Sequence, residues 1–438
     1  MNIVLLSGGS GKRLWPLSND IRSKQFIKIF KNENGEYESM VQRIYRQIKT
    51  VDSDANTIIA TSKSQVSEIN NQLGTNVGVS IEPCRRDTFP AIALATMYLK
   101  DVLKIDINES VVVCPVDPYV ENEYFEAIIN LAQKADEGEA NLVLMGIEPT
   151  YPSAKYGYII PESDDAVSFV KTFKEKPSEE VAEEYIKEGA LWNAGVFAYK
   201  LKYVIDKAHE LMDFEDYYDL FSKYETLEKI SFDYAVVEKE DKIQVQRFAG
   251  TWNDLGTWNT LTENIDDNVI GKGVLGDECK NVHILNETDV PILAMGLSDV
   301  VISASPEGIL VSDKHQSSYI KPYVDKFEQQ TMFAEKSWGS YNVIDVEKSS
   351  LTVKVTLNPN NKMNYHSHKH RDEIWTVISG SGRTIVDGME QMISTGDVIA
   401  IAAECKHTVM AGEEGLQLIE VQIGDEISVN DKIKWPQP

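Results

Sequence analysis

The 438-residue chain contains few cysteines and no long apolar run. Its four cysteines, Cys84, Cys114, Cys279 and Cys405, lie far apart and form no CxxC pair, which fits reduced thiols in a cytoplasm better than a disulfide framework. The apolar run at residues 3–6 leads directly into a glycine-rich loop, so we expect no signal peptide. No stretch approaches the roughly eighteen apolar residues of a membrane-spanning helix. We therefore expect a cytoplasmic protein without a membrane partner.

Positive charge is also scarce, because 43 lysines and arginines face 69 aspartates and glutamates and the net charge is −26. Such a chain lacks the basic field that non-specific binding to nucleic acid requires, so we expect no nucleic-acid partner. If the substrates are phosphates, lysines and arginines must be concentrated in one cleft. The hydrophobic content of 42% is ordinary for a globular protein, and the length allows two or three domains.

The first 267 residues alternate short apolar runs with amphipathic patterns. Buried strands are predicted at residues 2–9, 56–62, 109–117 and 141–147. Helices are predicted between them, at residues 39–48, 90–103 and 123–135. Continuous apolar strands between amphipathic helices predict an α/β domain over residues 1–267, with a mostly parallel, Rossmann-like sheet covered on both faces.

The pattern changes after this domain. Residues 268–331 contain short, glycine-punctuated β runs, which predict a small β-rich linker domain. Residues 323–336 carry a helix-like pattern that leads into a third domain, residues 332–438. This last domain contains β-branched, partly alternating runs, so we expect it to be built from strands.

Three of the seven histidines fall within five residues of the third domain, at His366, His368 and His370. Side chains two apart on a strand share a face, so we expect His366 and His368 to point together and His370 to point away. We expect His366, His368, Glu373 and His407 to bind one divalent transition metal, namely zinc, manganese, iron or nickel. His407 would approach from a facing strand. The alternative is a polar loop with solvated histidines.

A glycine-rich loop follows the first strand. It is not a P-loop, because Leu6 stands where that motif needs its first glycine and Arg13 follows Lys12. It is not a dinucleotide-binding fingerprint either, because Leu14 occupies the third glycine position.

The remaining interpretation of this loop is a phosphate cradle. Backbone N–H groups around Gly8, Gly9 and Gly11 can converge on phosphate oxygens. Arg13 and Lys24 can neutralise a triphosphate and its departing pyrophosphate. A tight strand-to-helix turn with surface cations is the alternative.

An ordered set of motifs resembles the sugar-1-phosphate nucleotidyltransferases, in particular the mannose-1-phosphate guanylyltransferase group. The motifs are GGSGKRLWPLS (8–18), KQF (24–26), EPCRRDTFPAIALA (82–95), CPVD (114–117), KYGYI (155–159), FKEKP (173–177), LWNAGVF (191–197), SFDYAVVEK (231–239) and TWNDLGTW (251–258). The segment from KSWGSY (336–341) to IEVQIG (419–424) is similar to the C-terminal domain of type II phosphomannose isomerases, a cupin β-barrel. Together the two resemblances span nearly the whole chain.

The resemblance implies transfer of a nucleotidyl group from an NTP, GTP in the first place, to a sugar 1-phosphate, α-D-mannose 1-phosphate in the first place. The products would be GDP-mannose and pyrophosphate. The implied catalytic residues are Arg13, Lys24, Asp117 and Asp254, of which the two aspartates hold Mg²⁺. The implied nucleotide-binding residues are Leu6, Gly8, Gly9, Gly11, Arg13, Lys24, Glu82, Arg86 and Asp87. The implied sugar-phosphate-binding residues are Tyr156, Gly157, Glu175, Lys176 and Asn193.

The chain departs from the family pattern around two of these positions. Asp117 is flanked by Val116 and Pro118 where the family has serine and histidine, and Asp87 stands where it has asparagine. Another manno-configured sugar 1-phosphate, such as that of a heptose, is therefore an alternative substrate. The two aspartates also have a plainer interpretation as helix caps or turn residues.

The cupin domain departs further. His366 occupies the position of a glutamine ligand, Ala402 and Glu404 replace a usual proline and glycine, and the arginine of the family's tail is absent. Arg371 and Lys406 are the candidate cations for a sugar phosphate. A mannose-6-phosphate isomerase activity and a sugar-nucleotide sensor with a non-catalytic cupin both stay open. The expected partners are small-molecule substrates, and a homo-oligomer, a dimer in the first place, is expected.

Overall fold

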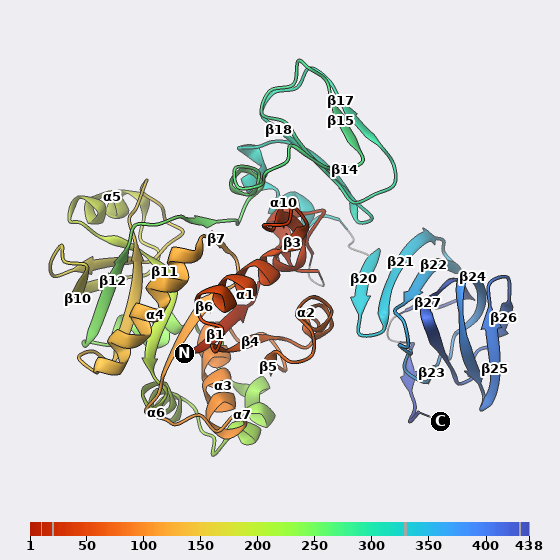
Figure 1. Cartoon of the computed structure of the whole chain (residues 1–438), viewed down its shortest axis with the longest axis horizontal. Coiled ribbons are helices and arrows are strands. Elements are labelled where there is room, and N and C mark those ends of the chain that lie inside the picture. Colours follow the sequence, from red (N-terminus) through yellow and green to blue (C-terminus); the bar gives the residue numbers. More distant parts are fainter. Residues whose placement is uncertain (10, 20–21, 328–330, 429–430, 438) are drawn as a thin grey trace. The chain divides into compact units, whose positions relative to one another are not determined.

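The computed structural model describes residues 1–9, 11–19, 22–327, 331–428 and 431–437 (Figure 1). The chain divides into two compact units. Unit 1 comprises Met1–Gly11 and Ser23–Asp266, and unit 2 comprises Lys12–Arg22 and Asp267–Pro438. Within the described ranges, no helix is both long and apolar enough to cross a membrane.

Unit 1 contains the α/β fold that its sequence predicts. Its strands are β1 (Asn2–Ser7), β2 (Lys28–Lys31), β3 (Tyr37–Ser39), β4 (Asn56–Ser62), β5 (Gly78–Glu82), β6 (Ser110–Pro115), β7 (Pro118–Val120), β8 (Leu142–Ile147), β9 (Tyr158–Pro161), β10 (Val167–Lys174), β11 (Leu191–Lys200), β12 (Ile243–Phe248) and β13 (Trp252–Asp254). Its α-helices are α1 (Met40–Val51), α2 (Val66–Leu73), α3 (Thr88–Asp101), α4 (Asn122–Glu137), α5 (Glu179–Lys187), α6 (Leu201–Leu211), α7 (Tyr217–Lys223), α8 (Phe232–Ala235) and α9 (Trp258–Thr262). Short 3₁₀ helices are η2 (Lys24–Phe26), η3 (Tyr224–Thr226) and η4 (Val237–Lys239). The four predicted strands are confirmed as β1, β4, β6 and β8, and the three predicted helices as α1, α3 and α4.

A nine-stranded sheet organises this unit, in the order β5-β4-β1-β6-β11-β8-β12-β10-β9. Strands β5, β4, β1 and β6 are parallel, as are β8 and β12. Strand β11 runs antiparallel to both β6 and β8, and β10 runs antiparallel to β12. The carboxyl ends of β1 and β6 therefore lie at the same edge of the sheet, where open α/β sheets bind ligands.

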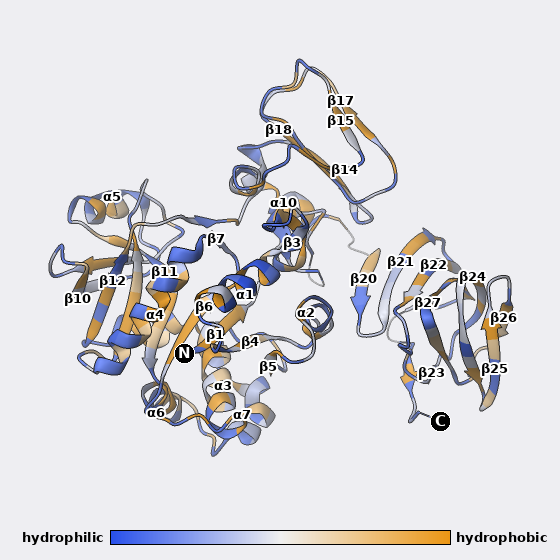
Figure 2. Cartoon of the chain, viewed as in Figure 1, coloured by the Kyte–Doolittle hydropathy of each residue, from blue (hydrophilic) through white to orange (hydrophobic). Residues whose placement is uncertain are grey.

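Hydrophobic residues concentrate in the strands of this sheet (Figure 2). On one face, Val4 and Val113 belong to a buried cluster with Ile92 of α3 and Val204 of α6. Successive strand residues alternate between faces, so Val112 points to the other face, which α4 covers. This two-sided burial explains why the strands read as continuous apolar runs.

Residues 269–313 of unit 2 form stacked turns of short β-strands, most of which pair in parallel. Its strands are β14 (Val269–Gly271), β15 (Gly273–Leu275), β16 (His283–Asn286), β17 (Ile292–Ala294), β18 (Val300–Ser305) and β19 (Gly308–Asp313). Strands β14, β16 and β18 pair in parallel and β15 pairs in parallel with β17, so the chain winds over a small core around Ile284, Ala294 and Ile302. The β-rich character predicted after residue 268 is present, in the form of stacked coils.

The segment Lys12–Arg22 packs within unit 2, although it is flanked by unit 1 in the sequence. The guanidinium of Arg22 forms two hydrogen bonds with the carboxylate of Glu287, at 2.6 and 2.9 Å. Ser305 Oγ donates to the carbonyl of Pro16 at 2.9 Å, and Asn19 Nδ2 donates to Glu307 Oε1 at 3.2 Å. The segment also contains the 3₁₀ helix η1 (Lys12–Leu14).

The C-terminal part of unit 2 is a cupin-type double-stranded β-helix. Its strands are β20 (Phe333–Lys336), β21 (Gly339–Val346), β22 (Ser350–Leu357), β23 (His366–Ser367), β24 (Arg371–Val386), β25 (Met389–Ser394), β26 (Val398–Ile401), β27 (His407–Gly424) and β28 (Ile433–Lys434). The long strands β24 and β27 pair with each other. Their residues Trp375, Val409 and Leu418 are fully buried and belong to one hydrophobic core cluster.

The helix predicted at residues 323–336 is wrong at its C-terminal end. Helical structure is limited to the 3₁₀ helix η5 (Gln316–Tyr319) and α10 (Lys321–Val324), and residues 328–330 lie outside the described residues. Residues Phe333–Lys336 form strand β20, because their backbone groups pair with β21 in a hairpin, and this pairing overrides the helical pattern.

The packing of α3 generates a stability prediction. We expect Ile92→Ala to lower the free energy of unfolding by about 2–5 kcal/mol, because it leaves a cavity in the fully buried cluster beneath the sheet. Urea unfolding of the full chain, followed by tryptophan fluorescence, measures the change. Ile107, with 38% of its surface exposed, is the matched control, and Ile107→Ala should cost less than about 1 kcal/mol. Equal losses in the two variants would contradict the assignment of this core.

Candidate functional sites

Two carboxylates of unit 1 converge on one lysine. Asp117 follows β6, and Asp254 ends β13. Lys24 Nζ lies 3.0 Å from Asp117 Oδ2 and 3.9 Å from Asp254 Oδ1, and it also donates to the carbonyl of Leu255 at 3.4 Å. All three charged side chains are partly exposed. The pair of partly exposed carboxylates is a donor set that suits Mg²⁺, which keeps several waters and takes few protein ligands.

A cavity of about 390 Å³ opens beside Asp117 at the carboxyl end of β1. Several residues predicted to bind the nucleotide line it, namely Leu6, Gly8, Gly9, Glu82 and Asp87. Gly9 has φ of 99° and Gly11 has φ of 59°, conformations that favour glycine. A Cβ atom at Gly8 or Gly9 would meet no atom within 4 Å, so these two glycines leave the backbone open to the cavity.

A buried hydrogen-bond network supports the first turn of this glycine loop. Gln25 Nε2 donates to Ser7 Oγ at 3.0 Å, and Gln65 Nε2 donates to Ser23 Oγ at 2.6 Å. Ser23 Oγ in turn donates to the carbonyl of Gly9 at 3.2 Å. The network ties the chain on both sides of the loop to β1 and the start of α2, so the loop is held by side chains beneath it.

The two arginines after β5 point in different directions, and Arg85 rather than Arg86 lies at the cavity where we expected Arg86 to contact the nucleotide. The guanidinium of Arg86 hydrogen-bonds the carbonyl of Glu225, whereas Arg85 lines the cavity. The neighbouring Asp87 has φ of 71°, a left-handed conformation that is rare outside glycine and asparagine. Its carboxylate accepts from the backbone N–H of Thr88 at 2.8 Å at the start of α3. This turn sets the directions of both arginines.

A second cavity, of about 240 Å³, adjoins the first and shares Pro115, Asp117, Gly195 and Asp233 with it. It is lined by all five residues predicted to bind the sugar phosphate, Tyr156, Gly157, Glu175, Lys176 and Asn193, and also by Asp254. Asp117 therefore stands where the two cavities join, and Asp254 lies on the side of the second cavity.

The backbone around the second cavity is closely fitted. A Cβ atom at Gly157 would lie 2.6 Å from Glu175 Oε2 and 3.0 Å from the ring of Phe173, so a side chain at this position would displace its neighbours. Lys176 has φ of 43°, and its ammonium pairs with the Glu175 carboxylate. The ring of Tyr156 lies 4.7 Å from that of Trp192 and 5.8 Å from that of Trp252, measured between centroids.

Asn193 presents a fixed amide to this cavity. Its Oδ1 accepts from the backbone N–H of Gly195 at 3.0 Å, and its Nδ2 donates to Asp233 Oδ1 at 2.8 Å. One lone pair of Oδ1 and one hydrogen of Nδ2 are thus used, and the second hydrogen on Nδ2 and the second lone pair on Oδ1 can be offered to a ligand. Burial raises the pKa of Asp233 to about 7, and the neighbouring Glu175 adds to the rise.

Asp233 itself was not identified from the sequence, although it lies in the motif SFDYAVVEK. Arg85 and Lys229 of the first cavity and Lys155 of the second were also missed. The sequence motifs do not indicate which of these charged loop residues face a cavity. Arg13, which was predicted to contact the nucleotide, lies in η1 of unit 2 with an exposed side chain.

Three buried histidines form a separate candidate metal centre in the cupin domain. One ring nitrogen from each of His366, His368 and His407 lies within 4.8 Å of the others. His366 and His407 are direct partners across β23 and β27, and His368 directly follows β23. His370 is exposed, and its backbone N–H donates to Asp431 Oδ2 at 3.0 Å.

The three rings are oriented by backbone carbonyls. Nδ1 of His366 hydrogen-bonds the carbonyl of Asn364 at 2.6 Å, that of His407 the carbonyl of Cys405 at 2.9 Å, and that of His368 the carbonyl of Asp431. Each Nδ1 must carry the hydrogen in these contacts, so each neutral ring keeps a lone pair on Nε2. Carbonyl partners of this kind are typical of histidines that ligate metals.

The fourth predicted ligand, Glu373, lies against two of these nitrogens. Its carboxylate oxygens are 3.1 Å from His368 Nε2 and 3.3 Å from His407 Nε2. Burial alone would raise the pKa of Glu373, but hydrogen bonds and positive charge from His368 and His407, when these rings carry a hydrogen on Nε2, hold it well below its usual range. Burial and the nearby Lys432 lower the pKa of His366 to about 2, which keeps that ring neutral. Neutral imidazoles and a carboxylate fit a divalent transition metal.

A cavity of about 720 Å³ opens from this centre, lined by His366 and His368. Of the two candidate cations, Arg371 lines the cavity and donates from Nε to Glu373 Oε1 at 3.2 Å. Lys406 instead lies over the ring of Trp435, with Nζ 3.9 Å from the ring centroid. The C-terminal segment contributes Lys432 and Lys434, two cations that were not identified from the sequence.

A buried acid faces these lysines. Glu420 of β27 lines the same cavity and has 8% of its surface exposed. Burial raises the pKa of Glu420 to about 7, and Glu373 adds to the rise. Burial lowers the pKa of Lys432 to about 8, against the opposing effect of Glu420. Both groups can therefore exchange protons near neutral pH.

Comparison with known proteins agrees with the two-part architecture. The nucleotidyl transferase family matches residues 2–268, and the family described as mannose-6-phosphate isomerase C-terminal matches residues 325–437. The mannose-1-phosphate guanylyltransferase RfbM of Salmonella typhimurium is 31% identical, with 99% of this chain and 96% of that protein covered. The alginate biosynthesis protein AlgA of Pseudomonas aeruginosa is 26% identical, with 98% of this chain and 95% of that protein covered.

A solved structure supports the same conclusion. The Thermus thermophilus protein titled mannose-1-phosphate geranyltransferase superposes with a TM-score of 0.62 at 28% sequence identity, covering 74% of this chain and 98% of that one. The nucleotidyl transferase match covers more than half of the chain, and the RfbM likeness extends over almost all of it. The chain therefore belongs to the nucleotidyl transferase family, in the group of mannose-1-phosphate guanylyltransferases that carry a C-terminal mannose-6-phosphate isomerase domain.

Proposed function

We propose that the chain transfers the guanylyl group of GTP to α-D-mannose 1-phosphate and releases GDP-mannose and pyrophosphate. The observation that carries this proposal is a pair of adjoining cavities that share Asp117, with Asp254 in the second cavity and Lys24 paired with both carboxylates. Full-length likeness to proteins named mannose-1-phosphate guanylyltransferases supports the choice of base and sugar.

In this proposal each cavity takes one substrate. The triphosphate lies in the cavity of about 390 Å³, against the open backbone of Gly8 and Gly9, with Arg85 supplying positive charge. The sugar phosphate lies in the cavity of about 240 Å³, where Lys176 contacts its phosphate and Asn193 donates to a hexose hydroxyl. Asp117 and Asp254 are the residues that would hold Mg²⁺, which would neutralise charge on the phosphates.

The reaction is an in-line displacement at phosphorus. A phosphate oxygen of the sugar 1-phosphate forms a bond to the α-phosphorus of GTP, while the bond from that phosphorus to the oxygen bridging the β-phosphate breaks. The attacking group is an oxygen of the substrate, so this reaction requires no side-chain nucleophile, and the residues of the chain act by holding the two phosphates in line and by charge neutralisation. The ammonium of Lys24, which lies 3.0 Å from Asp117 Oδ2, would stabilise the departing pyrophosphate.

We propose a second activity for the cupin domain, the interconversion of mannose 6-phosphate and fructose 6-phosphate. The observation that favours it is a metal-type centre beside buried groups that titrate near neutral pH, within one cavity of about 720 Å³. His366, His368, Glu373 and His407 would hold a divalent transition metal, which would polarise the substrate's carbonyl and hydroxyl oxygens. Glu420 is placed to move the proton between the two carbon atoms, and Lys432, Lys434 and Arg371 to bind the phosphate.

The transferase proposal is tested by pyrophosphate release with Mg²⁺ across a panel of nucleoside triphosphates and sugar 1-phosphates. We expect the highest kcat/KM with GTP and mannose 1-phosphate, because relatives that match almost the whole chain are named mannose-1-phosphate guanylyltransferases. A higher kcat/KM with a heptose 1-phosphate would identify the alternative substrate. If no pair released pyrophosphate, the transferase proposal would be wrong, and the chain would be better described as a sugar-nucleotide sensor.

The carboxylate pair gives a second test. We expect Asp117→Asn and Asp254→Asn each to lower kcat by about 10²–10³-fold, since each removes negative charge needed at the metal while the shape of the side chain is kept. Stopped assays of pyrophosphate release measure the loss, and circular dichroism checks that the variants are folded. Asp241 is an exposed control, and Asp241→Asn should retain normal turnover. Near wild-type turnover in either test variant would remove that aspartate from the metal site.

The cupin centre gives a third test, by elemental analysis. We expect the full chain to carry one divalent transition metal and the His368→Ala/His407→Ala variant to carry none, because two of three buried imidazole ligands are lost. His370→Ala should keep the metal, since His370 is exposed. The double variant should lose isomerase activity and retain pyrophosphate release within a few-fold. Metal retained by the double variant, or absent from the wild type, would contradict the assignment.

A further inference from the structure

The two carboxylates that pair with Lys24 are carried by a very short ribbon. Asp117 directly precedes β7, and Asp254 is the last residue of β13. The two strands form their own two-stranded sheet, with Val120 opposite Trp252 and Pro118 opposite Asp254. Two strands of three residues each are too short to fix their own position in water. Their placement therefore depends on contacts with other elements.

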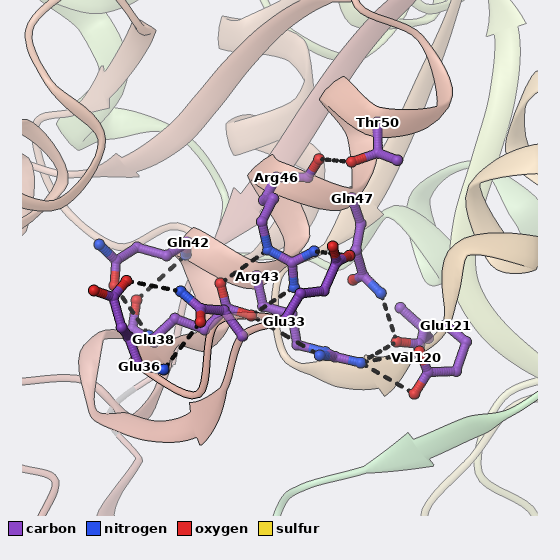
Figure 3. Close-up of polar contacts among 12 residues, drawn as sticks. Glu33, Glu36, Glu38, Gln42, Arg43, Arg46, Gln47, Thr50, Val120 and Glu121 are labelled. Atoms are coloured by element: carbon purple, nitrogen blue, oxygen red, sulfur yellow. Dashed lines mark hydrogen bonds and ion pairs between the residues drawn. The ribbon is translucent and has the colours of Figure 1, made fainter.

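Helix α1 supplies such contacts from two buried polar side chains (Figure 3). Gln47 Nε2 donates to the carbonyl of Val120 at 3.0 Å, and Arg43 Nη2 donates to the same carbonyl at 3.3 Å. Gln47 has 1% of its surface exposed and Arg43 has 7%. One backbone oxygen at the end of β7 thus accepts two buried hydrogen bonds from successive turns of one helix.

Arg43 also contacts the residues on both sides of Val120. Its Nη2 lies 3.0 and 3.1 Å from the two carboxylate oxygens of Glu121, and its guanidinium carbon lies 4.6 Å from the ring centroid of Tyr119. A single side chain therefore contacts three consecutive residues at the end of the ribbon. Because Val120 is opposite Trp252, fixing this end also fixes the strand that carries Asp254.

These contacts are made at a cost in stability. Among the described residues, neither Arg43 Nε nor Gln47 Oε1 has a hydrogen-bond partner, although both atoms are buried. Apolar side chains of similar size would avoid that desolvation cost. The polar pair is thus better explained by the position it imposes on β7 than by the stability it adds to α1.

Arg46, one turn from Arg43, provides a contrast on the same helix. Its Nη2 lies 2.7 Å from Glu38 Oε1 and its Nε lies 3.1 Å from Glu38 Oε2, so it binds α1 to the end of β3 (Figure 3). It is more exposed than Arg43, with 32% of its side chain accessible against 9%. Within the part of the chain that the structure describes, Arg46 forms no hydrogen bond or ion pair with β7, and the two arginines share only Glu38, whose Oε1 lies 3.9 Å from Arg43 Nη1.

We propose that Arg43 and Gln47 are positioning residues that hold the β7–β13 ribbon so that Asp117 and Asp254 face the same divalent cation. The inference rests on the proposed function for the identity of that cation. Neither side chain touches a substrate, and both act through the backbone of Val120.

The test measures Mn²⁺ binding to the full chain by electron paramagnetic resonance, which needs no turnover. The Mn²⁺ that Asp117→Asn fails to bind defines the N-terminal site and separates it from the cupin centre. We expect Arg43→Met and Gln47→Leu to weaken binding at this site by about 10–100-fold, the usual effect of removing a group that orients a metal ligand. Arg43→Lys should recover part of the loss, because an ammonium can still reach Glu121.

Kinetic measurements on the same variants distinguish positioning from general support of the fold. We expect kcat and the Mg²⁺ concentration for half-saturation to change, while the KM for the sugar phosphate stays within about twofold of wild type. Arg46→Met is the matched control, and it should leave Mn²⁺ binding unchanged even if it lowers the Tm as much as Gln47→Leu does.

Each outcome decides between the two proposals. Wild-type Mn²⁺ affinity in a folded Gln47→Leu variant overturns the positioning role. This result decides the question even if Arg43→Met fails to fold. Equal weakening in Arg46→Met overturns it as well, as does a wild type with no Mn²⁺ site that depends on Asp117. Weakened Mn²⁺ binding in both test variants of a chain that releases no pyrophosphate upholds the positioning role and overturns the transferase assignment.

Discussion

Two carboxylates held side by side repel each other unless positive charge lies between them. In this chain Asp117 and Asp254 are brought together by the pairing of β7 with β13, and Lys24 Nζ lies against both. The rest of the site is arranged around this pair: the glycine loop lines one of the cavities that meet at Asp117, and the residues predicted to bind the sugar phosphate line the other. In a chain with a net charge of −26, Lys24 and the cations that line the two cavities supply the local positive charge that anionic substrates need.

The cupin centre solves a similar problem with neutral ligands. Three backbone carbonyls fix the hydrogen of each imidazole on Nδ1, so that Nε2 lone pairs and the Glu373 carboxylate converge without a proton to share. The segment around β28 places Lys432 and Lys434 at the cavity that opens from this centre, so positive charge lies beside the neutral ligands.

The elements of the fold were predictable where sequence period and burial agree, as in β1, β6 and α3. The predicted helix at 323–336 failed because the pairing of β20 with β21 decides the structure of Phe333–Lys336. At the candidate site, ordered motifs located the loops but not the direction of each side chain. Arg85 and Arg86 are adjacent, and the turn at Asp87 turns one toward the cavity and the other toward Glu225. The carbonyl that Arg86 binds belongs to a residue 139 positions away, and local sequence patterns do not encode such a contact.

The membership of Lys12–Arg22 in unit 2 limits how this protein can be divided. The segment leaves unit 1 immediately after the glycine loop and returns just before Lys24, and it is held by Glu287, Ser305 and Glu307. A chain cut at residue 267 would retain Arg13 but lose the packing of the segment that carries it. The two units are therefore poor candidates for independent inheritance, and recombination or excision between them would separate one stretch of sequence from its structural support.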